Sequence, residues 1–258
     1  MRAVARLVVE ADGRGGTRLA VLRGESPLLL RRTGPRAGAG LTVHLVGGAA
    51  GPLRGDDLRL EIDVGPGAAL EVRSVAAQLA LPGRAGLPAS RLLVRAAVAA
   101  GGSVRWLPEP LIAAAGCDHR TETRVEVAAG GVLLWRDELV CGRHGEASGA
   151  VRSDITIRYG GTTLYRHELS VGPHAPGWSG AAVLGGGRAV GTLVAAAAAP
   201  AELPLPATAR PGPLAADAAL MPLAGPGMLA TAVGADIRRV RAALDPLCAS
   251  PAAVLAPV

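Results

Sequence analysis

The chain has 258 residues, half of them hydrophobic, and a formal net charge of +6. A chain of this length buries about 70% of its unfolded surface, so it needs no disulfide or metal to fold, and its apolar content excludes wholesale disorder. All 27 basic residues are scattered arginines and only 2% of the residues are aromatic, which excludes a nucleic-acid partner, because such proteins combine clustered cations with stacking aromatics.

Alternation of polar and apolar residues with a period of two dominates the sequence. Residues 57–64 read Asp-Leu-Arg-Leu-Glu-Ile-Asp-Val, the pattern of a strand with one buried and one solvated face. In chain order, strands are predicted at residues 3–10, 18–22, 41–46, 57–64, 69–75, 91–99, 103–107, 121–127, 132–140, 152–158, 163–171 and 189–194. Glycine-rich turns separate many of them, because glycine readily supplies positive φ.

The last quarter of the chain contains a loop and a helix. Five prolines between residues 200 and 213 predict an extended loop. Asp236 begins a run with Ile237, Val240 and Leu244 on one face, and Pro246 ends it, which predicts a short helix. The sequence therefore predicts a single domain over residues 1–258. Its fold class is mainly β, a large stack of antiparallel or mixed sheets, β-helical or sandwich-like, with one short C-terminal helix and few others.

Cysteine content and hydropathy indicate the cellular compartment of the protein. Cys117, Cys141 and Cys248 are far apart, so they predict no disulfide framework and suit a reducing environment. The first residues lack the apolar segment of a secretory signal. The longest uncharged apolar run, residues 189–201, is shorter than the about 20 residues that span a bilayer. We therefore expect a cytoplasmic protein with no membrane partner.

One segment resembles the nucleophile loop of chymotrypsin-like proteases. Ser179 stands in Gly-Trp-Ser-Gly, and His44 precedes it as a candidate base. No aspartate lies between Asp63 and Asp118, where the acid that orients the base is expected, so one role of the triad is missing. A serine hydrolase that uses Ser179 is therefore an alternative hypothesis, and a Gly-Ser turn between strands is the simpler interpretation.

Two cysteine–histidine pairs are candidate metal ligands. Cys117 precedes His119 by two residues, and Cys141 precedes His144 by three. Such ligands suit zinc or nickel, but the irregular spacing does not predict a structural metal site and leaves only a transient contact open. The glycines of residues 47–51 lack the Lys-Ser/Thr ending and the helix that hold phosphate, so no nucleotide is expected.

Three stretches, taken in order, resemble the family of urease accessory protein D (UreD, also called UreH). They are residues 51–60 with a Gly-Asp, residues 102–112 with Trp-Leu-Pro-Glu, and residues 141–149 with Gly-Arg and Gly-Glu. The sequence departs from the family pattern at residues 73–79 and 114–115. The matching residues are Gly51, Gly55, Asp56, Trp106, Leu107, Pro108, Glu109, Gly142, Arg143, Gly145, Glu146 and Gly149.

This resemblance implies an assembly factor and not an enzyme. Members of the family form a complex with accessory protein F and the GTPase G on the urease apoprotein, and together they deliver Ni(II) to urease. The implied mechanism is a scaffold with an internal passage, with no stably bound cofactor and only transient Ni(II). A generic β-sheet interaction domain is the remaining alternative.

The candidate passage residues are carboxylates in the matched motifs. Scattered carboxylates and water release a metal ion more readily than a Cys/His cage does. Asp56 and Glu146 each stand beside a glycine, so we expect them to line the passage. Neither position reads as core, and truncation of either side chain is predicted to cost little stability.

Overall fold

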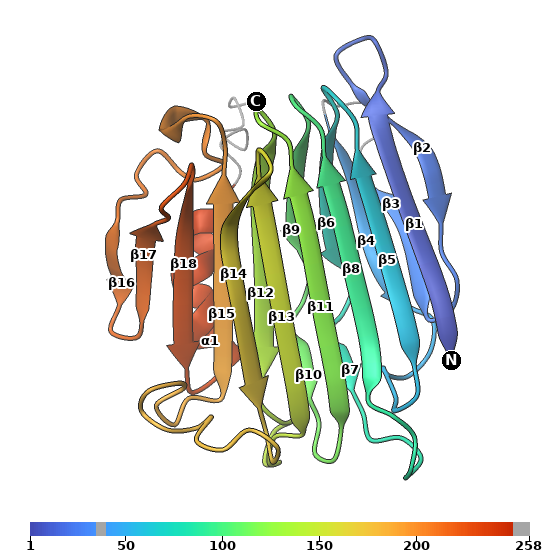
Figure 1. Cartoon of the computed structure of the whole chain (residues 1–258), viewed down its shortest axis with the longest axis vertical. Helices are drawn as coiled ribbons and strands as arrows, with labels where there is room; N and C mark the ends of the chain where they lie inside the picture. The colour runs from blue at the N-terminus through green and yellow to red at the C-terminus, as the bar shows by residue number, and fades with distance from the viewer. Residues whose placement is uncertain (35–39, 250–258) are drawn as a thin grey trace, which may run out of the picture.

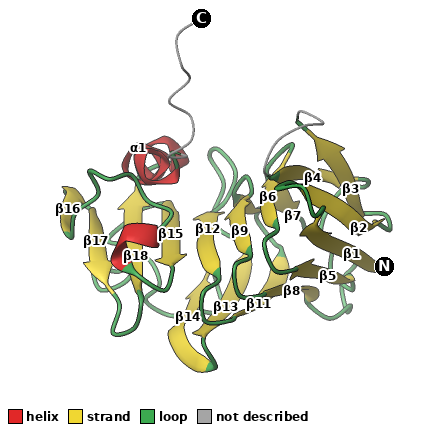
Figure 2. Ribbon diagram, turned by 90° about the horizontal axis from the view of Figure 1, so that it is seen from above, coloured by secondary structure: helices red, strands yellow, loops and turns green. Residues whose placement is uncertain are grey.

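The computed structural model describes residues 1–34 and 40–249, and in them two β-sheets lie face to face (Figures 1 and 2). Sheet A has seven strands in the order β14-β13-β11-β8-β5-β1-β2. Its outer face is solvated, as the alternation predicts, and it carries cross-strand ion pairs such as Arg91 with Glu122 at 2.6 Å. The strands are β1 (Arg2–Ala11), β2 (Thr17–Arg23), β5 (Asp57–Val64), β8 (Ser90–Val98), β11 (Asp118–Val127), β13 (Ala150–Tyr159) and β14 (Thr162–Val171).

Sheet B has eleven strands, nine of them in the order β16-β17-β18-β15-β12-β9-β6-β4-β3, with β10 and β7 added beside β12. The strands are β3 (Leu28–Thr33), β4 (Leu41–Gly47), β6 (Ala69–Ser74), β7 (Gln78–Ala80), β9 (Ser103–Leu107), β10 (Leu111–Ala113), β12 (Val132–Val140), β15 (Ala189–Ala196), β16 (Gly212–Ala215), β17 (Ala218–Pro222) and β18 (Gly227–Gly234).

The middle of the chain winds as a β-solenoid. From β4 to β13 it passes back and forth between the sheets, so that β5, β8, β11 and β13 are parallel neighbours in sheet A, and β4, β6, β9 and β12 in sheet B. Antiparallel strands cover both ends of the coil. Short glycine turns join sheet A to sheet B at one end, where Gly101 and Gly130 have positive φ. Longer loops return at the other end, the lower one in Figure 1.

The main core lies between the sheets and the second core lies under a helix. Leu7, Ile62 and Ile157 are fully buried between the sheets, where Trp106 stacks on Trp135 with ring centroids 4.7 Å apart. On the outer face of sheet B, Val240 of the short helix packs in a separate apolar cluster. The helices are α1 (Ile237–Leu244) and the 3-10 turns η1 (Pro200–Glu202) and η2 (Asp245–Cys248).

The predicted fold class is confirmed: the protein is a mainly-β stack with one short α-helix near its end. Every predicted strand is present, and Asp236 caps α1 by accepting a hydrogen bond from the Arg239 backbone N–H at 3.1 Å. The sequence did not reveal β3, β7, β10 or the three strands between Gly212 and Gly234. No helix in residues 1–34 and 40–249 combines the length and hydrophobicity needed to cross a membrane.

Candidate functional site: a cavity between the sheets

One half of the space between the sheets is packed and the other half holds a cavity of about 800 Å³. The inward-facing residues of the strands are apolar in the packed half and include polar residues in the half that holds the cavity. In β11, Val125 and Val127 fill the half nearer the glycine turns, whereas Thr121 and Thr123 line the cavity. In β12, Leu133 belongs to the core and Asp137 lines the cavity. The polar lining side chains include Ser74, Gln78, Glu109, Thr121, Thr123, Asp137, Glu138, Ser153, Tyr165, His167, Thr192 and Thr231.

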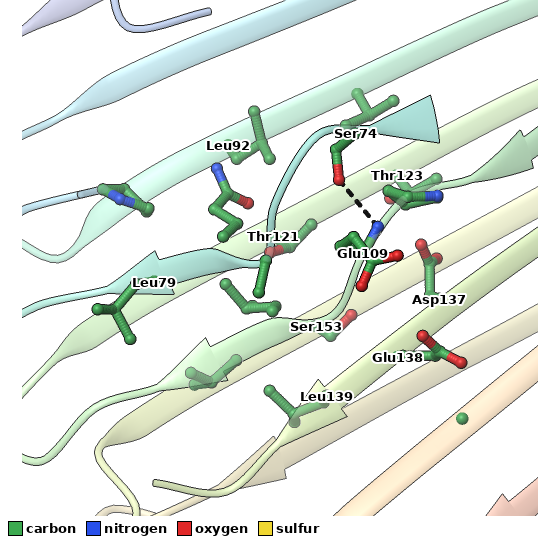
Figure 3. Close-up of a pocket in the computed structure, with 18 of the residues that line it drawn as sticks. Ser74, Leu79, Leu92, Glu109, Thr121, Thr123, Asp137, Glu138, Leu139 and Ser153 are labelled. Atoms are coloured by element: carbon green, nitrogen blue, oxygen red, sulfur yellow. Dashed lines mark hydrogen bonds between the residues drawn. The ribbon is translucent and has the colours of Figure 1, made fainter. Parts of the chain in front are cut away.

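Asp137 is the acidic side chain that β12 directs into this interior (Figure 3). Its Oδ1 accepts a hydrogen bond from the indole N–H of Trp106 at 3.2 Å, and its Oδ2 accepts one from Trp135 at 2.9 Å. The stacked indoles thus hold both carboxylate oxygens. Burial raises the pKa of Asp137 even though the two indole donors and Arg136 act in the opposite direction.

A tyrosine and a histidine of sheet A complete the aromatic lining. The rings of Tyr165 and His167 are stacked with centroids 6.1 Å apart on β14. Burial, and then the negative charge of Asp137, raises the pKa of the Tyr165 hydroxyl to about 12. Tyr165 is therefore a neutral hydrogen-bonding group at any physiological pH.

Asp56, a predicted passage residue, lies in the turn that leads into β5 and is not among the lining residues. Its Oδ2 accepts a hydrogen bond from the Leu53 backbone N–H at 2.9 Å, and its Oδ1 lies 2.7 Å from the amino group of Met1. Gly51, in the same turn, does line the cavity. The expectation that Asp56 lies outside the core is wrong, because the residue is only 8% exposed. Its carboxylate is directed into the turn, where it bonds to the Leu53 N–H.

Glu146, the second predicted passage residue, lies in the loop between β12 and β13 and is also not among the lining residues. Its Oε2 accepts hydrogen bonds from Arg143 Nε at 2.8 Å and from the Ala115 backbone N–H at 3.3 Å. The bond from Arg143 lowers the pKa of Glu146 to about 2. Asp56 and Glu146 thus share the long-loop end of the solenoid, but no contact joins the two carboxylates in the described residues.

The glycines of the matched motifs allow backbone conformations and close contacts that the long-loop end of the solenoid requires. Gly55 and Gly145 have positive φ in turns, as do Gly51 and Gly142. A Cβ on Gly149 would lie 2.2 Å from the Ala114 carbonyl oxygen, so only glycine permits that approach.

The tryptophan motif does reach the cavity. Trp106, Pro108 and Glu109 line it, whereas Leu107 points to the other face of sheet B and packs in the cluster that α1 covers. The structure therefore brings Trp106 and Glu109 together with Asp137, which the sequence analysis did not single out. Its signal was an acidic residue at an inward-facing position of β12, where the other inward-facing residues, Leu133, Trp135 and Leu139, are apolar.

The cysteine–histidine pairs do not form a joint site. Burial raises the pKa of the Cys117 and Cys141 thiols to about 11. His119 is buried with Nδ1 2.9 Å from Ser90 Oγ, whereas His144 is exposed. Within residues 1–34 and 40–249 no three His, Cys, Asp or Glu side chains are grouped to hold a metal ion.

The serine and the histidine of the hydrolase hypothesis lie apart. Ser179 is exposed in the loop between β14 and β15, and Trp178 beside it packs against the small cluster around Leu184. His44 is on β4, where its Nδ1 lies 2.6 Å from Thr33 Oγ1. Three strands of sheet B separate β4 from β15, so nothing in the fold assembles a nucleophile with this base.

Fold and site together define a class: a mainly-β protein of two facing sheets with a cavity between them, whose mainly apolar wall carries a few acidic and hydroxyl side chains. A sequence profile described as UreD urease accessory protein matches residues 1–256. The chain is 47% identical over 247 residues to urease accessory protein UreD 3 of Streptomyces griseus subsp. griseus, covering 95% of both chains. It is 47% identical over 246 residues to UreD of Streptomyces avermitilis, again covering 95% of both, and 44% identical to UreD of Frankia alni, covering 95% of this chain and 93% of that one. The chain belongs to the UreD urease accessory protein family.

Proposed function

We propose that this chain is a non-catalytic scaffold of urease maturation in the cytoplasm. It binds the urease apoprotein and accessory proteins F and G, and its cavity passes Ni(II) from the GTPase G towards the urease active site. Family membership supports the role in maturation. The observation that carries the passage is the cavity itself, with Asp137 at its polar surface.

The chemistry of the lining suits a passing ion. Ni(II) prefers nitrogen and sulfur ligands for tight binding, whereas separate oxygen ligands hold it weakly and let water remain bound. Asp137 already accepts two indole N–H groups, and burial raises its pKa. Both effects reduce its attraction for a cation. The hydroxyls of Thr121, Thr123 and Ser153 offer further weak ligands, as a conduit that must release its ion requires.

Adjacent residues of β13 allow a matched test. Ser153 lines the cavity, whereas Arg152 points to solvent on the outer face of sheet A, where it pairs with Glu168. Ser153→Trp fills the passage, and Arg152→Trp adds the same ring outside it. In cells that express urease and its accessory proteins, we expect S153W to lower the nickel content of purified urease several-fold, and R152W to leave it unchanged.

Assembly must be measured in the same cells. Both variants should co-purify with accessory proteins F and G, because neither change touches an exposed loop. Fully nickel-loaded urease in cells that hold a folded, assembled S153W scaffold would exclude passage through the cavity.

A further inference from the structure

Sheet B is interrupted beside β12. The pairing of β12 with β9 ends at Trp135 opposite Trp106, and its pairing with β10 begins at Leu139 opposite Leu111. Residues 108–110 stand between the two paired segments, and two of these three residues are prolines, which have no N–H to donate to a ladder. Residues 136–138 of β12 therefore have no strand partner on this side.

The next strand breaks at the same level, between the end of β6 and the start of β7. Ser74 bridges the break: its Oγ accepts a hydrogen bond from the Glu109 backbone N–H at 2.9 Å and donates one to the Ala76 carbonyl at 2.9 Å (Figure 3). We call residues 75–77, 108–110 and 136–138 the sheet B window. The cavity is lined by residues of all three segments, so it reaches the window from inside.

Three carboxylates surround the window. Asp137 points to the interior and binds the indoles, while Glu138, the next residue of β12, points to the face that α1 covers. Glu109 extends from the interrupted segment, and Figure 3 shows its carboxylate on the same side of the cavity as the other two. The acidic groups thus run from the cavity, through the sheet, to the underside of α1.

A single cation from α1 closes the outer side of this series. Arg241 Nη2 lies 2.8 Å from Glu138 Oε2 and 3.0 Å from Glu109 Oε2. Arg241 Nε also donates to Glu138 Oε2 at 3.0 Å. One guanidinium therefore stands between two carboxylates of the window, in the position where a passing metal ion would be attracted.

One carboxylate oxygen at the window accepts no hydrogen bond within residues 1–34 and 40–249. The side chain of Glu138 is 1% exposed, yet its Oε1 accepts no hydrogen bond from any described residue. Arg136 Nε, which also has no hydrogen-bond partner among the described residues, forms an ion pair with this oxygen at 3.6 Å. A buried carboxylate oxygen without a donor strongly attracts any cation that can reach it.

We propose that the sheet B window is a gated opening of the cavity for a divalent metal ion, with Glu109 and Glu138 as its ligands and Arg241 as the gate. This inference rests on the proposed role of the cavity and assigns it one exit. The arriving ion displaces the guanidinium from the two carboxylates. The returning guanidinium competes for the same oxygens and so favours release of the ion, since two carboxylates without it would retain a divalent cation more strongly.

The stacked tryptophans provide a direct readout in the isolated protein. Trp106 and Trp135 contact Asp137 at the window, and Ni²⁺ quenches indole fluorescence at short range. Trp178→Phe leaves these two as the only tryptophans. On this background, purified protein is titrated with NiCl₂. We expect Arg241→Met, which keeps the apolar stem of the side chain, to reach half-maximal quenching at a nickel concentration at least tenfold lower.

Arg238→Met is the matched control, because Arg238 is exposed on the same helix and pairs with Asp236. It should titrate like the parent, and adding Glu109→Gln to Arg241→Met should remove most of the gain. Equal titrations of folded R241M and R238M would overturn the gate. If R241M does not fold, Arg241→Gln, which also removes the charge, replaces it, and an unshifted curve for folded R241Q overturns the proposal equally. Failure of the gate would leave the S153W result intact, so the two hypotheses fail separately.

Discussion

At the scale of single residues, the interior accommodates two ionisable groups in different ways. Asp137 accepts hydrogen bonds from two indoles and retains a raised pKa. His119 sits between hydroxyls, with Nδ1 2.9 Å from Ser90 Oγ and Nε2 3.1 Å from Thr121 Oγ1, and burial lowers its pKa to about 4. A neutral imidazole satisfies both hydroxyls with one donor and one acceptor, so the site favours that form.

The lowered pKa of His119 makes stability depend on pH. The unfolded chain binds a proton near the ordinary histidine pKa of 6.5, whereas the folded chain binds it only near 4. The free energy of unfolding therefore falls as pH drops from about 6.5 to 4, by up to about 3 kcal/mol. We predict that His119→Gln flattens this part of the profile, measured by urea unfolding between pH 4 and 7.

Exposed His144 supplies the control, since His144→Gln removes a histidine without touching the interior. It should reproduce the wild-type profile. A His119→Gln profile as steep as that of wild type would show that other groups cause the loss of stability in acid.

Sequence reasoning found only some of the site residues, for physical reasons. Trp106 and Glu109 were marked by a short motif with defined spacing, and both reach the cavity. Asp137 was missed because one acidic residue among three successive charged residues gives no motif, although its parity places it inside. The partnership of Arg241 with Glu138 joins residues 103 positions apart, and it depends on how α1 docks, which no local pattern encodes.

At the scale of elements, a strand is predicted from sequence most clearly when one of its faces is buried and the other is exposed to solvent. The alternation was clear in β5, β11 and β13, because sheet A has a solvated outer face. It was absent from β17 and weak in β18, since α1 and neighbouring loops cover sheet B there and alanine fills both faces. Strands β7 and β10 have three residues each and stand beside the interruption of sheet B, so they are too short to show a period.

Helix α1 depends on one glycine of β15. A Cβ on Gly191 would lie 2.6 Å from Val240 Cγ1 and 2.7 Å from Leu244 Cδ1, both on the buried face of α1. We predict that Gly191→Ala pushes the helix from sheet B and lowers the free energy of unfolding by about 1–3 kcal/mol. Hydrogen exchange at the α1 amides should quicken, because the helix loses its packing.

Gly47→Ala is the matched control within a strand. Its added Cβ would have no neighbour closer than the Ala49 carbonyl oxygen, at 3.8 Å. It should change stability by no more than about 0.5 kcal/mol and leave exchange in α1 unaltered. Unchanged hydrogen exchange of the α1 amides in Gly191→Ala would mean that the added methyl group fits between β15 and α1. Close packing of α1 on Gly191 would then not be what fixes the position of Arg241.

At the scale of the whole molecule, the two ends of the solenoid differ in chemistry. Short glycine turns close one end over a packed core, while long loops with charged side chains close the end that holds the cavity. Asp56 and Glu146 both lie in those loops. The Asp56 carboxylate is 3.5 Å from the Cβ position of Gly51, which itself lines the cavity, so Asp56 stands directly behind the wall.

The nickel role predicted from sequence for Asp56 and Glu146 can therefore be separated from their structural role. Asp56→Ala should cost about 1–3 kcal/mol, because it leaves the Leu53 N–H without its acceptor. Glu146→Ala should cost little, since its ion pair with Arg143 is at the surface. We predict that the double alanine variant still assembles with accessory protein F and that urease matured through it carries less nickel.

The double variant Asp56→Asn with Glu146→Gln decides between charge and shape. Asparagine can still accept from the Leu53 N–H, although it loses the ion pair with the Met1 amino group, so the bond that holds the turn is retained while both negative charges are removed. If these charges draw Ni(II) towards the cavity, the conservative pair lowers the nickel content of urease as much as the alanine pair does. If the carboxylates only hold their turns, the conservative pair matures urease fully and only the alanine pair fails, in proportion to its loss of stability. Metal analysis of urease beside urea unfolding of each scaffold variant distinguishes these outcomes. Full nickel loading through both variants, each shown to be folded, would leave the cavity lining as the only acidic path for the ion.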